Sequence, residues 1–315
     1  MNAVALSLFS SKVGAVASEM GALLQRAAFS PNIKDRQDFS CALFDAEGDL
    51  CAQAAHIPVH LGSMAYAMAD IVNAVKWRAG DMLILNNPYL GGTHLPDITL
   101  VAPCFIHDQC VAFVCNRAHH ADIGAESPGS MPVSRSLAEE GLIIDPVLLL
   151  QQGVVDETVQ KKLLSRLKNP KLAWGDFSAQ IAANQLGLKR LSALIGDMSV
   201  SGWQESLVAL NDYAERLSVS ALKAVPDGEY HFCDQLDDDG QGARNIPISL
   251  MLRVKKGRVT LDFSQSALQV SGNVNCPLSV VAAAVYYAFR CLMPDQLPAC
   301  AGSFRVLKLI VSKGC

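Results

Sequence analysis

Residues 84–129 read ILNNPYLGGTHLPDITLVAPCFIHDQCVAFVCNRAHHADIGAESPG, and the rest of the chain is organised around them. Four of the seven histidines lie in this stretch. The runs 98–106 and 110–116 are apolar and rich in β-branched residues, and the short polar turn His107-Asp108-Gln109 separates them. Two such runs around a short turn predict an antiparallel β-hairpin.

The open end of this hairpin has the composition of a metal site. The pairing places Asp97 opposite His119, and directly opposed residues have Cβ atoms about 4.5–5.5 Å apart. His94 precedes Asp97 in the same Gly/Pro-rich turn and can close on the same point. Two imidazoles and a carboxylate suit Zn²⁺, Mn²⁺ or Fe²⁺. The residues alone leave open the alternative that each His/Asp pair is an ordinary surface or capping contact.

Four segments carry a family resemblance: SPNIKDRQDFSCALFDAEGDL at 30–50, AAHIPVHLGSM at 54–64, NNPYLGGTHLPDITLVAP at 86–103 and NRAHHADIG at 116–124. They resemble the hydantoinase B/5-oxoprolinase family, whose relatives include the large subunits of acetone and acetophenone carboxylases. The resemblance runs from about residue 10 to the last residue. It implies one subunit of a two-part, ATP-dependent enzyme that opens a cyclic amide such as 5-oxoproline, a hydantoin or a lactam.

The resemblance also implies roles for single residues. Four are expected to bind the metal: Asp38 of the DFS segment, His94, Asp97 and His119. In this hypothesis the metal lowers the pKa of a bound water to about 7 and presents it to a carbonyl activated by ATP. His120 or Asp122 would then handle the proton as the catalytic group.

A second set is expected to lie close to the substrate: His60, Asn87, Gly91 and Gly92. Pro58 disfavours a helix around His60, so a tight loop is predicted to bring this imidazole to the site. The glycine pair lets the backbone approach a ligand closely. Asn87 stands where the family usually has Asp, and an amide cannot carry the charge of a carboxylate, which weighs against a metal or base role there.

The remaining patterns predict an α+β fold, with β-hairpins and mixed sheets around a helical middle segment. Helices are predicted over 6–27, over 63–77 with Ser63 as N-cap, near 157–168, 176–195 and 203–224, and over 278–292. Further strands are predicted at 39–44, 50–54, 82–85, 230–233, 248–254, 259–263 and 304–311. The loop 126–150 is long enough to cover the site.

Three regions follow from this order. Residues 1–150 form an N-terminal α/β region with the His/Asp site, 151–225 a helical region, and 226–315 a β-rich region with one buried helix. The resemblance implies that a C-terminal part is missing, which would leave an unpaired strand edge.

Composition excludes several classes of protein. A net charge of −4 in 315 residues gives no electrostatic footprint for nucleic acid. No apolar run approaches the roughly 18 residues that span a membrane, and no basic segment marks a signal peptide. None of the ten cysteines forms a CxxC pair, so we expect small buried hydrophobes in a reducing cytoplasm.

The phosphate-binding pattern GxxxxGK[ST] is missing from the sequence, which agrees with ATP being bound by a hydantoinase A-like partner in a hetero-oligomer. Two alternatives remain: an ATP-dependent ketone carboxylase subunit, and an inactive remnant or assembly subunit, which the short chain and Asn87 favour. The retained His/Asp set argues against the second.

Overall fold

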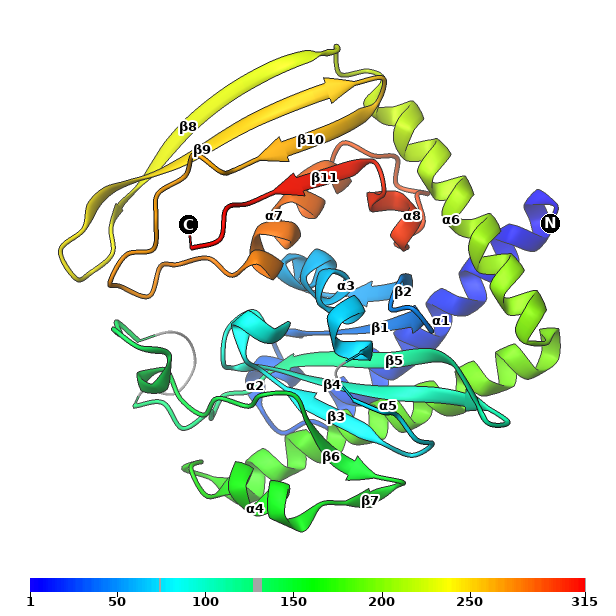
Figure 1. The fold of residues 1–315 in the computed structure, drawn as a ribbon. Helices are drawn as coiled ribbons and strands as arrows, with labels where there is room; N and C mark the ends of the chain where they lie inside the picture. Colours follow the sequence, from blue (N-terminus) through cyan, green and yellow to red (C-terminus); the bar gives the residue numbers. More distant parts are fainter. Residues whose placement is uncertain (74, 127–131, 315) are drawn as a thin grey trace.

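The computed structural model describes residues 1–73, 75–126 and 132–314 (Figure 1). These residues form a seven-stranded sheet in the order β2-β1-β5-β4-β3-β6-β7 and a four-stranded sheet in the order β11-β10-β9-β8. Together with the helices they confirm the predicted α+β class. Part of the predicted loop 126–150, namely residues 127–131, lies outside the described residues.

The bounds of the elements are as follows. The strands are β1 (Phe39–Asp45), β2 (Leu50–Ala55), β3 (Met82–Leu85), β4 (Asp97–Ile106), β5 (Gln109–His119), β6 (Val147–Gln151), β7 (Val154–Val155), β8 (Gly228–Asp238), β9 (Arg244–Lys255), β10 (Arg258–Asp262) and β11 (Leu307–Ile310). The helices are α1 (Ala3–Ala27), α2 (Pro31–Lys34), α3 (Pro58–Val72), α4 (Glu157–Leu164), α5 (Pro170–Met198), α6 (Val200–Leu222), α7 (Leu278–Arg290) and α8 (Ala301–Phe304), with short 3₁₀ turns η1 (Pro88–Leu90) and η2 (Leu137–Glu139).

The seven-stranded sheet is covered by helices on both faces. Successive side chains of a strand point to opposite faces. Leu43 and Ile98 therefore belong to the core that α1 and α5 cover, whereas Phe44 and Val101 belong to the core under α3. Because both faces of this sheet are buried, most positions of its strands are apolar, and the strands therefore form nearly continuous apolar runs in the sequence.

Helix α7 links the two sheets. It packs against α3 on one side, and the four-stranded sheet lies on its other side (Figure 1). The two helices approach closely at Gly62, where an added Cβ would lie 2.5 Å from Tyr286 Cδ2 and 2.9 Å from Ala283 Cα. Only glycine fits at this crossing.

The expectation for residues 58–63 is wrong. Helix α3 begins at Pro58 and not at Ser63, because proline is well tolerated at the first helical position, where its missing N–H has no helical partner to lose. His60 therefore lies in the first turn of a helix rather than in a loop. The Ser63 hydroxyl does not cap the helix but donates to the Val59 carbonyl at 2.8 Å.

Other boundaries shift by smaller amounts. The predicted strand 304–311 begins later, because α8 ends at Phe304 and β11 covers Leu307–Ile310. Helix α5 begins at Pro170, ahead of the predicted start at 176, again with proline at the first helical position.

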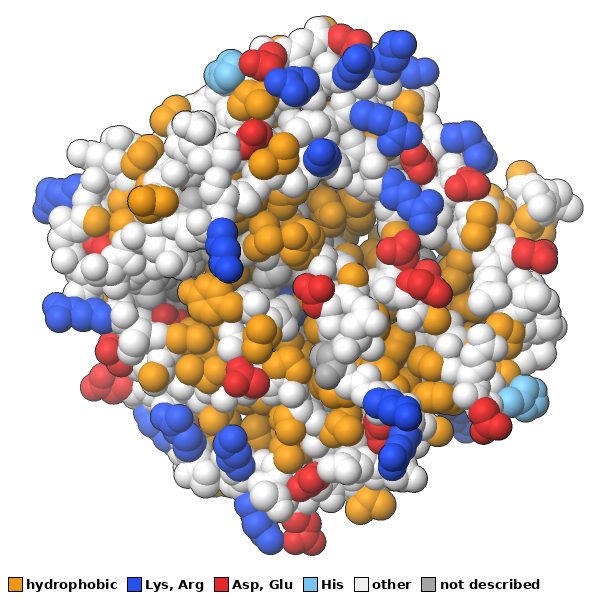
Figure 2. Space-filling model, viewed as in Figure 1, with side chains coloured by type: hydrophobic (Ala, Val, Ile, Leu, Met, Phe, Trp, Pro, Cys, Tyr) orange, Lys and Arg blue, Asp and Glu red, His pale blue; other side chains and the backbone are white. Residues whose placement is uncertain are grey.

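The surface carries charges of both signs. Figure 2 shows Lys and Arg side chains interspersed with Asp and Glu over one face, in keeping with the small net charge of −4. Among the helices of the described residues, none combines the length and the apolar character that crossing a membrane requires.

Asp45, at the end of β1, makes stability depend on pH. Its Oδ1 accepts hydrogen bonds from the backbone N–H groups of Glu47 and Asp49, yet burial raises its pKa from 3.8 to about 6. Because the pKa of this carboxyl group is higher in the folded than in the unfolded protein, its protonated form adds stability below the unfolded-state pKa. This stability is lost as the pH rises through the folded-state pKa of about 6. Asp45→Asn should therefore stabilise the protein by on the order of 1 kcal/mol at pH 8, after allowance for solvent screening, and by almost nothing near pH 4.

Urea unfolding of Asp45→Asn at the two pH values measures this difference. The control is Asp234→Asn, which makes the same change of carboxylate to amide at an exposed position on β8. Equal destabilisation of Asp45→Asn at both pH values would contradict the prediction.

Candidate metal centre

The mouth of the β4–β5 hairpin is built as the sequence predicts. Asp97 pairs directly with His119 in the register of the two strands. On the other side of β5, Phe39 of β1 pairs with Ala118, and the His119 N–H donates to the Asp38 carbonyl at 2.9 Å. Three neighbouring strand ends therefore meet at one point.

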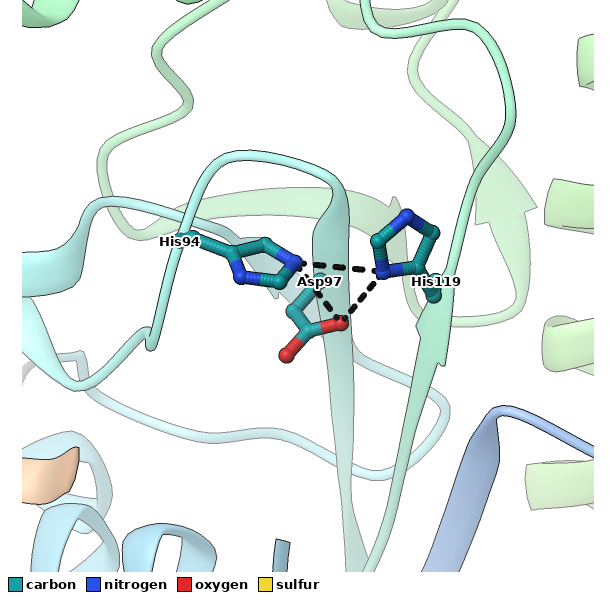
Figure 3. Close-up of side chains that lie close together, drawn as sticks. All are labelled: His94, Asp97 and His119. Atoms are coloured by element: carbon teal, nitrogen blue, oxygen red, sulfur yellow. Dashed lines mark hydrogen bonds and ion pairs between the residues drawn. The ribbon is translucent and has the colours of Figure 1, made fainter. Parts of the chain in front are cut away.

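Three side chains converge at this point (Figure 3). His94 Nε2 lies 3.4 Å from Asp97 Oδ1, and His119 Nδ1 lies 3.5 Å from the same oxygen. The two imidazole nitrogens are 3.1 Å apart. Asp38 completes the set, since its Oδ2 lies 3.5 Å from His119 Nδ1. The structure thus brings together all four residues that were expected to bind a metal.

The cluster is buried on one side and open on the other. The side chain of Asp97 is 1% exposed, whereas those of His94 and Asp38 are each 26% exposed. A small molecule can therefore reach the cluster past His94 and Asp38.

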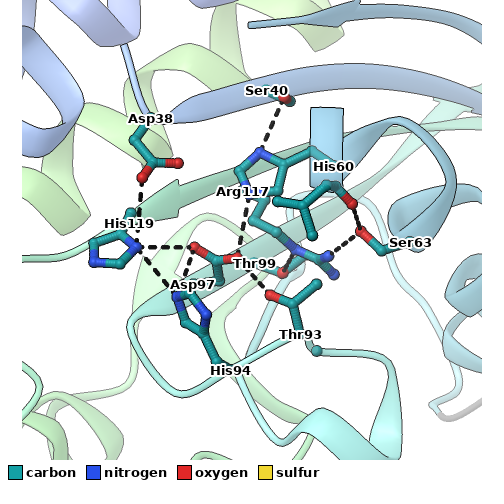
Figure 4. Close-up of polar contacts among 12 residues, drawn as sticks. Asp38, Ser40, His60, Ser63, Thr93, His94, Asp97, Thr99, Arg117 and His119 are labelled. Atoms are coloured by element: carbon teal, nitrogen blue, oxygen red, sulfur yellow. Dashed lines mark hydrogen bonds and ion pairs between the residues drawn. The ribbon is translucent and has the colours of Figure 1, made fainter. Parts of the chain in front are cut away.

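The two oxygens of Asp97 have different surroundings (Figure 4). Oδ2 accepts a hydrogen bond from the Thr93 hydroxyl and lies 3.2 Å from His60 Nε2. His60 is fully buried, and its Nδ1 lies 3.0 Å from the Ser40 hydroxyl. Oδ1 is also buried but has no hydrogen-bond partner among the described residues.

The charges of the site act on one another. Burial alone would raise the pKa of Asp97, but His60 and His94 outweigh it and hold this pKa well below the usual range. Burial alone would likewise lower the pKa of His94, yet Asp97 and Asp38 raise it overall. The site thus favours a carboxylate beside positive charge.

These residues fit a divalent metal ion. A buried carboxylate oxygen without a donor is energetically unfavourable, and a cation at Oδ1 would remove that penalty. The donor atoms of His94, Asp97 and His119 all lie within 4.8 Å of one another. Two imidazole nitrogens with carboxylate oxygens match Zn²⁺, Mn²⁺ and Fe²⁺.

The turn that carries His94 is held at both ends by Asn86. The buried Asn86 amide donates to the carbonyls of Leu95 and Leu142 at 2.7 and 2.9 Å, and its oxygen accepts the N–H of Ile144 at 2.7 Å. The neighbouring Asn87 instead caps the η1 turn and donates to Asp145 at 2.7 Å. Both asparagine side chains therefore have partners within the protein.

The two glycines of this turn also serve the protein itself. Gly91 has φ 109°, and its carbonyl accepts a hydrogen bond from Arg117 at 2.7 Å. The Gly92 carbonyl accepts one from the Ser279 hydroxyl at 2.6 Å. A substrate role for these glycines, or for Asn87, remains a prediction.

Arg117 is a part of the site that the sequence analysis missed. It is fully buried on the sheet face under α3, and its guanidinium donates to Thr99, Ser63 and Gly91 at 2.7–2.8 Å. Burial lowers its pKa, and the Asp97 carboxylate partly offsets this. Residues two positions apart in a β-strand lie on the same face, so counting two residues from Asp97 and from His119 would have placed Thr99 and Arg117 on the face of the site.

His120 and Asp122 lie away from these contacts. His120 follows β5 toward the α5 side, where its ring packs against Phe177 in a tilted arrangement and its Nε2 lies 2.9 Å from Gln180 Oε1. Both carboxylate oxygens of Asp122 accept backbone N–H groups, from Gly124 and Asn169. His119 and His120 thus point to opposite faces of the sheet, and the catalytic roles of His120 and Asp122 remain predictions.

The family model described as hydantoinase B/oxoprolinase matches residues 2–315, so the chain belongs to this family. It is 34% identical to the 5-oxoprolinase of Saccharomyces cerevisiae over 99% of the chain and 25% of that protein. It is 32% identical to a putative D-/L-hydantoinase subunit of a Pseudomonas species over 95% of the chain and 54% of that protein.

A solved structure shows the same fold. The ATP-dependent caprolactamase of Pseudomonas jessenii superposes with a TM-score of 0.91 at 25% identity, over 99% of the chain and 54% of that protein's chain. The chain therefore spans about half the length of the caprolactamase and hydantoinase relatives, and a quarter of the 5-oxoprolinase.

Proposed function

We propose that this chain supplies the metal-binding half of an ATP-dependent enzyme that opens a cyclic amide. The observation that carries the proposal is the convergence of two imidazole nitrogens, at 3.4 and 3.5 Å, on the buried Asp97 Oδ1, which has no close hydrogen bond among the described residues. The names of the relatives supply the reaction class, since they include a 5-oxoprolinase, a hydantoinase subunit and a caprolactamase.

The four residues of the cluster share one role in this proposal, which is to bind the metal. His94, Asp97, His119 and Asp38 hold a divalent ion, and such an ion acidifies water and polarises a carbonyl oxygen. His94 and Asp38 border the open side, so the amide approaches there. An unactivated amide is a poor electrophile, and phosphorylation of its oxygen by an ATP-binding partner subunit would activate it.

The contact with Gln180 defines which nitrogen of His120 carries the hydrogen. Gln180 Nε2 donates to Ile98 and Asn116, which fixes its Oε1 as an acceptor. His120 Nε2 must therefore carry a hydrogen, and Nδ1 of the neutral ring keeps its lone pair. A catalytic role for His120 stays a prediction, because its ring faces α5 on the opposite face of the sheet from His119, and Asp122 orders the backbone around it.

The first test is the metal content of the purified chain, followed by titration with Zn²⁺ and Mn²⁺. About one equivalent per chain is expected, together with ATP-dependent opening of 5-oxoproline or hydantoin once a hydantoinase A-like partner is added. A chain that takes up no metal but still binds the partner would be an assembly subunit, and the proposal would fail.

His60 is expected to position Asp97. His60→Leu leaves Asp97 Oδ2 with Thr93 as its remaining partner, so the carboxylate loses its fixed orientation. Metal affinity should fall by about 10- to 100-fold, as is usual for outer partners of metal ligands. His60→Gln keeps an N–H donor and should recover part of the affinity, measured by calorimetric titration. Identical affinities in both variants and the wild type would refute this role.

A further inference from the structure

Arg135 is the one Lys or Arg side chain among the described residues that line the pocket beside His94. Three segments line this pocket: the turn 88–94, the loop 135–140 and the loop 270–277. Its volume of about 230 Å³ is below the range of about 300–1,000 Å³ that is usual for drug-sized ligands. The pocket suits a molecule of one small ring with a substituent.

Arg135 is an exposed side chain whose guanidinium contacts a neutral amide. Its Nε donates to Gln241 Oε1 at 2.6 Å, a contact that anchors one edge of the guanidinium. Its backbone N–H donates to Glu139, and Glu139 also accepts a bond from the Ser136 hydroxyl. Among the residues that the structure describes, no carboxylate forms an ion pair with this guanidinium. Hydrogen bonds from the Arg135 N–H and the Ser136 hydroxyl lower the pKa of Glu139, and the Arg135 charge adds a smaller contribution.

Glu140 is the other charged side chain in the lining. Its Oε1 accepts a hydrogen bond from the Ser134 hydroxyl at 2.9 Å. Among the described residues, no hydrogen bond engages the terminal nitrogens of the Arg135 guanidinium. An anionic ligand group in this pocket would therefore pair with Arg135 and lie away from Glu140.

We propose that Arg135 is a specificity-determining residue that binds an oxyanion of the substrate. The substrate would be a small cyclic amide that carries a carboxylate, or the same amide after phosphorylation of its oxygen. A guanidinium offers two parallel N–H donors, which match the two oxygens of either group. The inference rests on the proposed function, because it places the ring between Arg135 and His94.

The test measures direct binding to the purified chain by calorimetry or ligand-observed NMR. Three probes separate the contributions of the ring, the carboxylate and a phosphate group to binding. They are L-5-oxoproline, the same ring without its carboxylate (2-pyrrolidinone), and inorganic phosphate. The variant is Arg135→Gln, and the control is Arg253→Gln, which lies on β9 in an ion pair with Glu229. A charge-assisted contact is worth about 1.5–3 kcal/mol, so Arg135→Gln should weaken 5-oxoproline by about 10- to 100-fold.

The control Arg253→Gln should bind 5-oxoproline as the wild type does, and Arg135→Gln should leave any binding of 2-pyrrolidinone unchanged. Phosphate that competes with 5-oxoproline and is weakened in Arg135→Gln would identify the phosphorylated form as the oxyanion, whereas no phosphate binding would identify the carboxylate. The inference is overturned if Arg135→Gln binds 5-oxoproline like the wild type, or if the wild type binds it no more tightly than 2-pyrrolidinone.

Metal titration of the same samples distinguishes a failure of the oxyanion subsite at Arg135 from a failure of the proposed metal-dependent function. Full metal binding in Arg135→Gln with unchanged 5-oxoproline affinity would refute the oxyanion subsite alone. Absence of metal binding in the wild type would refute the proposed function instead.

Discussion

His94→Ala is expected to lose the metal without losing the fold. The imidazole supplies one of the two nitrogens that face Asp97 Oδ1, and it is 26% exposed, so its removal leaves little buried space unfilled. Outer partners of metal ligands already contribute about 10- to 100-fold in affinity, so loss of a direct ligand should exceed 100-fold. If the proposed function holds, ATP-dependent ring opening in the presence of a hydantoinase A-like partner should fall to background in the same variant.

Elemental analysis after dialysis, together with circular dichroism, measures both outcomes. His119→Ala should behave in the same way, although it is more buried and its stability needs separate measurement. His231→Ala is the matched control, because that histidine is 70% exposed on β8 and pairs with Glu229. Full metal content in both His94→Ala and His119→Ala would rule out this cluster as the metal centre.

Gly92→Ala is expected to prevent correct folding of the site-bearing turn. A Cβ at this position would lie 2.2 Å from the Asn86 carbonyl oxygen and 2.8 Å from the Asn87 carbonyl oxygen, and both are backbone atoms that cannot rotate away. The turn would have to open, which breaks the contacts that hold His94. We expect a loss of more than about 3 kcal/mol, beyond the range of ordinary substitutions.

The control is Gly14→Ala in α1, where nothing lies within 4 Å of the added Cβ. Alanine is the better helix former, so this variant should gain about 0.5–1 kcal/mol. Thermal and urea unfolding of the two variants should move in opposite directions. A Gly92→Ala protein as stable as the wild type would show that the turn has another conformation.

Much of the site could be predicted because hairpin pairing is a local rule. A short turn between two β-branched runs fixes the register, and the register alone places Asp97 against His119. His94 follows because it belongs to the same turn. These contacts depend on residues that are close in sequence or directly paired.

The contacts of His60 and Arg117 could not be predicted in the same way. A proline such as Pro58 can either begin a helix or interrupt one, and in the folded protein it begins helix α3. Arg117 reads as a solvated charge inside a strand, and its burial depends on Ser63 and Gly91 from two other elements. The catalytic role of Asp122, which the family resemblance implies, stays a prediction; its oxygens accept the backbone N–H groups of Gly124 and Asn169.

The contact between Ser279 and Gly92 has a consequence for how this protein can be divided. The hydroxyl that steadies the histidine-bearing turn comes from the start of α7, 187 positions further along the chain. Residues 1–150 contain every candidate ligand, yet expressed alone they would lack this hydroxyl and the α7 surface against which α3 packs. The His/Asp cluster is therefore not part of a detachable N-terminal module, and truncations intended to isolate it should retain α7.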